Sequence, residues 1–351
     1  MRRLLRPSTP LRDWRWRVNE RIHRRPNQGP DVGETDRQGL HGHRAIPVAP
    51  RFDESIPVPS TFRPARGVSN PVLTRKDVTD YGRVHFVADP FLFITSDGLW
   101  YLFFEVFNKD RSPTAVIGHA TSPDGGRTWT YDGVVLSDSL HLAFPYVFRW
   151  ENTYYMLPEK WDRNRPAPVD LYATDSLPEG WSRVATLVSP DHRLHDCVLF
   201  RWDGRWWLLG GDGNRLYAYH NDELESETWQ PHERNPVVTD RPSAARPGGR
   251  PIVTTESIRV FLQDCLDKYG HRVRGYEITD LTPSSYADRE RPTSPDLTPA
   301  SGSIGWNTGR MHHVDPWYVG DRWYCAVDGN VGLGERLLGA DHWAIGIYDG
   351  S

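Results

Sequence analysis

The sequence predicts an all-β fold, a five-bladed β-propeller that follows an irregular N-terminal extension. The first observation is a motif that recurs along the 351 residues: an apolar strand, a turn of Gly, Asp or Asn, and an aromatic-rich strand. This order is the signature of a β-hairpin. The second observation is the spacing, because copies begin at Asp89, Phe144, Asp196 and Asp315, with room for a fifth before Asp315. The third is that helix signals are weak throughout. Five such units are typical of a propeller.

The N-terminal extension, residues 1–50, is rich in Arg and Pro. We expect it to be irregular and to run over the surface. The propeller is expected to occupy residues 51–351 and to begin near Phe52. The start of the chain is basic but lacks an apolar stretch, so it does not predict a secretory signal.

The first blade is predicted over residues 80–135. It contains Ser122-Pro-Asp-Gly-Gly-Arg-Thr-Trp129, which matches the Asp-box pattern S-x-D-x-G-x-T-W. In this pattern Ser and Asp side chains bond backbone groups of a hairpin turn while the Trp packs beneath. We therefore interpret it as structural and distant from any active centre.

The other four blades follow in order along the chain. The fifth copy of the motif is expected from Arg246–Arg250 to Ile258–Leu262. The stretch 284–302, rich in Ser, Pro, Asp and Thr, predicts a long loop before the last blade. The predicted blade ranges are 138–183, 190–232, 235–283 and 300–348.

Composition excludes several classes of function. The formal net charge is −4, so no basic field attracts nucleic acid or an anionic membrane. No apolar run approaches the roughly 20 residues that a membrane span needs. The three cysteines show no C-x-x-C pairing, which favours buried free thiols over a metal site, a disulfide framework or a nucleophile. We expect a cytoplasmic protein without cofactor or metal.

The repeat places acids where they could meet. The first strand of each propeller blade lines the central channel, so equivalent positions converge on the axis. Three copies of the motif begin with an acid, at Asp89, Asp196 and Asp315. A position with only a folding role would hold similar apolar residues in every blade. The pattern therefore predicts a shared site for two-carboxylate chemistry.

Several further motifs occur in order over roughly residues 80–330. They are Ala88–Phe93, Tyr155–Glu159, Gly204–Leu208, Asn235–Val238, Arg246–Arg250, Gln263–Cys265, Tyr269–Gly270 and Glu277–Pro283. Together they resemble the N-terminal domain of glucosamine inositolphosphorylceramide transferases and its stand-alone microbial relatives, which is similar to the propellers of glycoside hydrolase families 43 and 32. Because the sphingolipid transferases carry a separate transferase domain after this propeller, we do not expect ceramide transfer itself.

The resemblance to these hydrolases implies three catalytic acids. Asp89 would be the base or nucleophile, Asp196 the orienting acid and Asp264 the general acid. Asp264 stands where the hydrolases have Glu, so its side chain is one methylene shorter. Each acid also has a structural interpretation: Asp89 could bond turn amides, and Asp264 could form an ion pair with Arg246 or Arg250.

A second group of residues is predicted to bind substrate. In Met311-His-His-Val-Asp315 the two histidines are adjacent and would face opposite sides of a strand, so we favour hydrogen bonding to sugar hydroxyls over a metal. The arginines could instead pair with axial acids. Trp161 and Trp306 are candidate platforms for a sugar ring. The predicted substrate-binding residues are His313, Asp315, Glu159, Arg250, Arg246, Gln263 and Trp161.

Two functions follow from these predictions. The first is an enzyme that hydrolyses or transfers a glycosidic bond of a glycan or glycoconjugate through Asp89, Asp196 and Asp264. The second is a non-catalytic glycan-binding module that assists a separate glycosyltransferase. A protein scaffold ranks third, because it would leave the axial acids without purpose.

Overall fold

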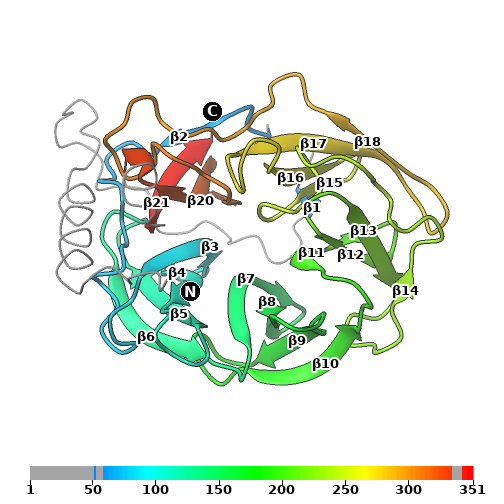
Figure 1. Ribbon diagram of the computed structural model, residues 1–351, viewed down its shortest axis with the longest axis horizontal. Coiled ribbons are helices and arrows are strands. Elements are labelled where there is room, and N and C mark those ends of the chain that lie inside the picture. Colours follow the sequence, from blue (N-terminus) through cyan, green and yellow to red (C-terminus); the bar gives the residue numbers. More distant parts are fainter. Residues whose placement is uncertain (1–50, 53–57, 334–341, 351) are drawn as a thin grey trace, which may run out of the picture.

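The described residues, 51–52, 58–333 and 342–350 of the computed structural model, form five β-sheets around a central axis (Figure 1). Each sheet has four or five strands and runs from the axis outward. The predicted all-β, five-bladed propeller is confirmed. The predicted extension, residues 1–50, lies outside the described residues. Among the described residues, no helix has both the length and the apolar character needed to cross a bilayer.

Blades one to three are each built from four consecutive antiparallel strands. Their aromatic and β-branched residues suit a buried pleated surface. The strands of blade one are β3 (Phe86–Ile94), β4 (Trp100–Phe107), β5 (Ala115–Ser122) and β6 (Thr130–Leu136). Those of blade two are β7 (His141–Trp150), β8 (Thr153–Trp161), β9 (Val169–Thr174) and β10 (Ser182–Val188). Those of blade three are β11 (His195–Trp202), β12 (Arg205–Gly211), β13 (Leu216–Asn221) and β14 (Gln230–Pro231).

Blades four and five each include a strand from the start of the propeller. In blade five, β2 (Phe62–Pro64) pairs antiparallel with β21 (Trp343–Gly350), so the ring is closed by strands from both ends of the propeller. Blade four contains β1 (Arg51–Phe52), β15 (Ile252–Thr254), β16 (Ile258–Asp264), β17 (Arg272–Leu281) and β18 (Tyr286–Glu290). Blade five contains β19 (Val314–Val319), β20 (Arg322–Asn330), β21 (Trp343–Gly350) and β2 (Phe62–Pro64).

Blade four extends further than the sequence predicts. Strand β18 lies within residues 284–302, where we expected a long loop, and it pairs with β17. The physical reason is a short turn: the Thr282 N–H donates to the Ser285 carbonyl, which returns the chain antiparallel to β17. The prediction of a loop over the whole of 284–302 is therefore wrong.

The Asp-box forms the turn between β5 and β6. Asp124 accepts hydrogen bonds from the backbone N–H groups of Arg127 and Thr128 and from the Ser122 hydroxyl. The Gly126 N–H donates to the Ser122 hydroxyl, and the Trp129 indole donates to the Gly126 carbonyl. These bonds satisfy the turn internally, and the predicted structural role is confirmed.

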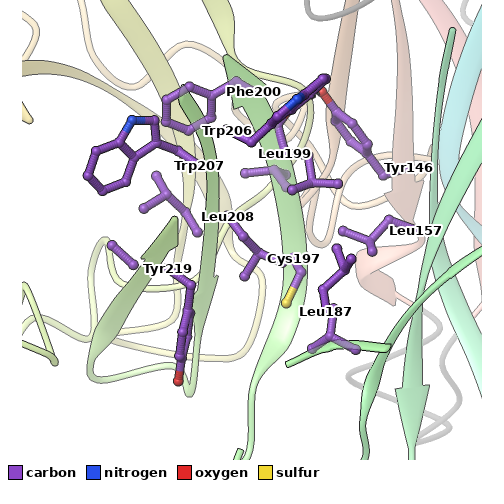
Figure 2. Packing of buried hydrophobic residues seen from close by; sticks show 14 of the residues in the cluster. Tyr146, Leu157, Leu187, Cys197, Leu199, Phe200, Trp206, Trp207, Leu208 and Tyr219 are labelled. Atoms are coloured by element: carbon purple, nitrogen blue, oxygen red, sulfur yellow. Dashed lines mark hydrogen bonds between the residues drawn. The ribbon is translucent and has the colours of Figure 1, made fainter. Parts of the chain in front are cut away.

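Apolar side chains fill the space between adjacent blades. Figure 2 shows part of this packing, with Tyr146 and Leu157 of blade two facing Cys197 and Leu199 of blade three. The buried Tyr146 hydroxyl donates to the Leu199 carbonyl over 2.7 Å, which satisfies its polar end. A fully buried side chain of this size contributes roughly 1.5–3 kcal/mol to folding. The three cysteines are free, and only Cys265 is partly exposed.

The first motif position has a special backbone in three blades. Asp89, Phe144 and Asp196 have φ values of 53°, 46° and 52°. In each blade the ladder between the first and second strands shifts register at this residue. Such a β-bulge bends the strand and re-aims a side chain. The third acid of the motif, Asp315, lies in the regular ladder of β19 and β20.

Candidate functional site

Five carboxylates gather where the inner ends of four blades meet. The burial of Asp89 and the negative charges of Asp196, Glu105, Asp328 and Glu159 hold the pKa of Asp89 well above its usual range. Blade one supplies Asp89 and Glu105, and blades two, three and five supply one acid each. We call this group the axial acid cluster. The predicted convergence of Asp89 and Asp196 is therefore present in the structure.

The Asp89 carboxylate has the fewest protein partners in the cluster. Among the described residues, no hydrogen bond to its carboxylate is present, and its side chain is 11% exposed. Two imidazole nitrogens lie close to it: Asp89 Oδ1 lies 3.8 Å from His312 Nδ1 and 4.0 Å from His313 Nδ1. A buried carboxylate usually has partners. Asp89 therefore remains available to a ligand.

Asp196 is held from two sides. The Arg246 Nε donates to Asp196 Oδ2, and the Gln263 side-chain amide donates to the same oxygen over 2.5 Å. Burial raises the pKa of Asp196 to about 7, against the opposing positive charge of Arg246. The arginine and the glutamine, both predicted to bind substrate, thus contact an axial acid directly. For Arg246 this is the alternative pairing that the sequence analysis left open.

The two glutamates of the cluster each contact a histidine. Glu159 Oε1 lies 2.7 Å from His195 Nδ1, and Glu105 Oε1 lies 3.2 Å from His141 Nε2. Burial raises the pKa of Glu159, but His195 and Arg246 more than offset this and hold it well below its ordinary value. Glu105 is buried as well, with 6% of its surface exposed.

Asp264 does not join the axial acid cluster. Its carboxylate accepts hydrogen bonds from Arg272 and Arg274, both on the neighbouring strand β17. Successive residues of a strand face opposite sides of the sheet, and in β16 it is Gln263 that reaches Asp196. Burial raises the pKa of Asp264, but the arginines outweigh burial and lower it. The sequence suggested an ion pair with Arg246 or Arg250, but the partners are Arg272 and Arg274. These contacts favour the ionised form of Asp264, which cannot donate a proton.

Asp315 and Arg250 form a buried pair that links blades. Arg250 Nε donates to Asp315 Oδ1 over 2.7 Å, and its Nη2 donates to the carbonyls of Leu92 and Val147. The side chains are 0% and 2% exposed. His313 is also fully buried. In this conformation none of these three predicted substrate-binding residues reaches solvent.

Two exposed aromatic side chains flank the cluster. Trp161 is 38% exposed and packs edge-on against His141, the partner of Glu105. Tyr269 is 44% exposed, packs edge-on against His312 and lies under the Arg246 guanidinium. Trp306, by contrast, is 1% exposed, so it is core and offers no platform.

The second strands of the blades carry a regular sequence signal for the residue that faces the axis. Glu105, Glu159 and Gly211 pair with the residue directly before the bulged position of their blades. Gln263 and Asp328 stand at the same position of the second strand in blades four and five. All five come five residues after an apolar or aromatic residue, namely Trp100, Tyr154, Trp206, Ile258 and Trp323. This spacing identifies Asp328, which was missed, and selects Gln263 over Asp264 as the blade-four residue that faces the axis.

The two histidines before β19 lie on the same side. They precede the strand, so the alternation that we used to argue against a metal does not apply to them. Both ring Nδ1 atoms lie within 4.0 Å of Asp89 Oδ1. One donor atom each from Asp89, His312 and Asp328 lie within 4.8 Å of one another.

A separate surface hollow of about 720 Å³ lies on the outer part of blade two. Its lining includes Thr153, Thr174, Glu179 and Glu225. None of its lining residues belongs to the axial acid cluster. The hollow is open and mostly formed by turns, so it does not displace the cluster as the candidate site.

Comparison with known proteins identifies the family of this chain. Residues 47–330 match the family model described as glucosamine inositolphosphorylceramide transferase 1, N-terminal. The chain belongs to this family. The family's curated relative from Oryza sativa subsp. indica is 36% identical over 274 residues, which is 75% of this chain and 36% of the relative. The relative from Arabidopsis thaliana is 35% identical over 260 residues, 71% of this chain and 32% of the relative. The chain thus spans about a third of these transferases.

Solved structures show the same fold at low identity. The catalytic domain of a family 62 α-L-arabinofuranosidase from Coprinopsis cinerea has a TM-score of 0.55 and 13% identity, covering 84% of this chain and 98% of that one. A family 32 β-fructofuranosidase from Bombyx mori has a TM-score of 0.52 and 12% identity, covering 77% and 64%. These similarities establish the glycoside-hydrolase-like propeller fold for this member of the family.

Proposed function

We propose that the axial acid cluster is a sugar-binding site and that this domain presents a glycan or glycoconjugate to a separate glycosyltransferase. The observation that carries the proposal is the meeting of acids from four blades beside two exposed aromatic rings, Trp161 and Tyr269. Carboxylates accept hydrogen bonds from sugar hydroxyls, and an aromatic face packs against the apolar face of a sugar ring. The relatives' name, glucosamine inositolphosphorylceramide transferase, supports a glycan ligand.

The pairing of the acids favours binding over two-carboxylate catalysis. Asp196 is bound to Arg246 and Gln263, and Glu159 to His195. Asp264, the expected general acid, faces its two arginine partners on β17. Within the axial acid cluster, only the Asp89 carboxylate accepts no hydrogen bond from a described residue. Glycosidic hydrolysis normally needs two free carboxyl groups flanking the bond.

The proposal is tested by screening a broad glycan panel for binding to the full chain and to Asp89→Asn and Trp161→Ala variants. We expect each substitution to weaken binding about tenfold, because each removes one charged acceptor or one aromatic platform. Asp264→Asn is the matched control and should bind like the unmodified chain. If no glycan binds, or if both variants bind normally, the sugar site is wrong.

A second candidate function is glycosidic hydrolysis or transfer with Asp89 as base or nucleophile. It is favoured by the pKa of Asp196, which burial raises to about 7, so that this carboxyl holds a proton near neutral pH. A proton donor poised at that pH is what general-acid catalysis requires. If this candidate is right, Asp89→Asn abolishes turnover of a panel glycan while binding of that glycan survives.

A further inference from the structure

The two histidines beside Asp89 are placed by backbone contacts to one carboxylate. The Asp328 carboxylate accepts the backbone N–H groups of His312 and His313, each over 3.1 Å, and that of Asp89 over 3.2 Å. One side chain thus fixes the backbone of all three neighbours. The arrangement ties the start of blade five to blade one without using the imidazole rings.

The rings themselves are fixed by aromatic packing. His312 stacks on Trp343 with ring centroids 4.0 Å apart. His313 packs edge-on against Phe91 and Phe144, at 4.6 Å and 5.2 Å. Metal sites require donors held in place by such surrounding contacts. Both imidazoles are therefore oriented before any ligand arrives.

The donor atoms are close enough to share one ion. His312 Nδ1 lies 2.7 Å from Asp328 Oδ2 and 3.8 Å from Asp89 Oδ1, and His313 Nδ1 lies 4.0 Å from that same Asp89 oxygen. Ligand atoms about 2.1 Å from a shared ion lie roughly 3–3.5 Å apart. Small side-chain adjustments bring the observed distances into that range.

An independent observation points to a missing ligand. His313 is fully buried, yet neither of its ring nitrogens makes a well-formed hydrogen bond with a described group. The backbone carbonyl of Pro90 interacts with the His313 ring. Leaving a buried polar atom unsatisfied costs about 1–3 kcal/mol.

From this geometry we propose that Asp89, His312 and Asp328, with His313 as a further donor, form a binding site for a divalent transition-metal ion. Mixed imidazole and carboxylate donors suit ions such as Zn²⁺ and Mn²⁺, whereas Ca²⁺ and Mg²⁺ prefer oxygen ligands alone. A bound cation would also relieve the repulsion between the Asp89 and Asp328 carboxylates. The alternative is a simple hydrogen-bonded ion pair between His312 and Asp328 that binds no metal.

The test is metal titration of the full chain by calorimetry after treatment with EDTA, with Zn²⁺, Mn²⁺ and Ca²⁺ as separate ligands. We expect one Zn²⁺ or Mn²⁺ to bind per chain, with Ca²⁺ much weaker. Asp89→Asn should weaken binding at least about tenfold, as should His312→Gln. Asn tolerates the positive φ of residue 89, so that variant should keep its backbone. Asp264→Asn serves as the control and should bind the metal normally.

A second measurement needs no variant. A ligand that binds only the folded state raises the melting temperature, so saturating Zn²⁺ or Mn²⁺ should stabilise the unmodified chain and leave Asp89→Asn unchanged. The proposal is overturned if neither ion binds, or if binding survives both substitutions undiminished. Because no sugar is present in these titrations, their result is independent of the sugar-binding proposal.

Discussion

Gly211 illustrates how a single residue shapes the site. It stands in blade three at the second-strand position that holds Glu105 in blade one and Glu159 in blade two. A Cβ atom there would lie 1.9 Å from the Ala245 carbonyl oxygen. The absence of a side chain lets the segment carrying Arg246 approach the axis. Arg246 then supplies the charge that contacts Asp196.

We predict that Gly211→Ala destabilises the protein by about 1–3 kcal/mol, the usual range for overpacking. The backbone carbonyl in the way cannot move as a side chain would. Urea unfolding followed by fluorescence measures the change. Gly204→Ala is the comparison, since nothing lies within 4 Å of its added Cβ and its only cost is the positive φ of 77°. Equal effects of the two substitutions would contradict the steric argument.

At the scale of elements, Lys160 joins two parts of blade two. Its ammonium lies 2.8 Å from Asp138, just before β7, and 2.9 Å from Asp170 in β9. Burial raises the pKa of Asp138, but Lys160 and nearby donors more than offset burial and lower it from 3.8 to about 2. A carboxyl whose pKa is lower in the folded state stabilises the fold above its unfolded pKa. That stabilisation is lost as the pH falls through the folded value.

We therefore predict that the free energy of unfolding decreases between about pH 4 and pH 2 partly through Asp138, given its shift from 3.8 to about 2. Asp138→Asn should flatten this part of the pH profile and lower stability at pH 6. Urea unfolding at several pH values measures both effects. Asp222→Asn, which removes an exposed ion pair with Arg205, should leave the profile unchanged. A profile identical for Asp138→Asn and the unmodified chain would contradict the assignment.

Strand β2 is the element that completes the ring. Phe62 is 6% exposed and its ring packs edge-on against Phe261 of blade four. We predict that Phe62→Ala costs about 3 kcal/mol, near the lower end for a buried Phe. Thermal or urea unfolding gives the measurement. Arg63→Ala on the same strand, an exposed residue, should change stability by less than about 0.5 kcal/mol. If both changes have equal effects, Phe62 does not hold the closure together.

At the scale of the whole molecule, Arg250 connects four blades. It lies just before β15 of blade four, pairs with Asp315 of blade five and donates to carbonyls of blades one and two. We predict that Arg250→Met destabilises the protein by about 3–5 kcal/mol, since it leaves Asp315 buried without its partner. Unfolding by denaturant provides the measurement. The double variant Arg250→Met with Asp315→Leu should recover part of the loss. No recovery would contradict the charge-burial explanation.

The fold could be predicted from the repeat because each blade is a local unit with its own periodicity. The convergence of Asp89 and Asp196 followed from the repeat as well. The direction of Asp264 did not, because a one-residue difference in register reverses the face to which a strand residue points. His312 was judged by strand alternation, although the strand begins only at Val314. Asp328 went unnoticed because its position shows only when the second strands are aligned with one another.

Asp89, Phe144 and Asp196 share a left-handed backbone conformation although their side chains differ in chemistry. Asn, Asp and Gly accept this conformation with little penalty, whereas Phe144 occupies it at some energetic expense. Blade two thus has the same backbone conformation as the two Asp positions, but it carries an aromatic hydrocarbon side chain there. Exchanging that ring for an amide would install a new polar group at the centre of the molecule without rerouting the polypeptide. The propeller can therefore acquire a different ligand preference through one codon.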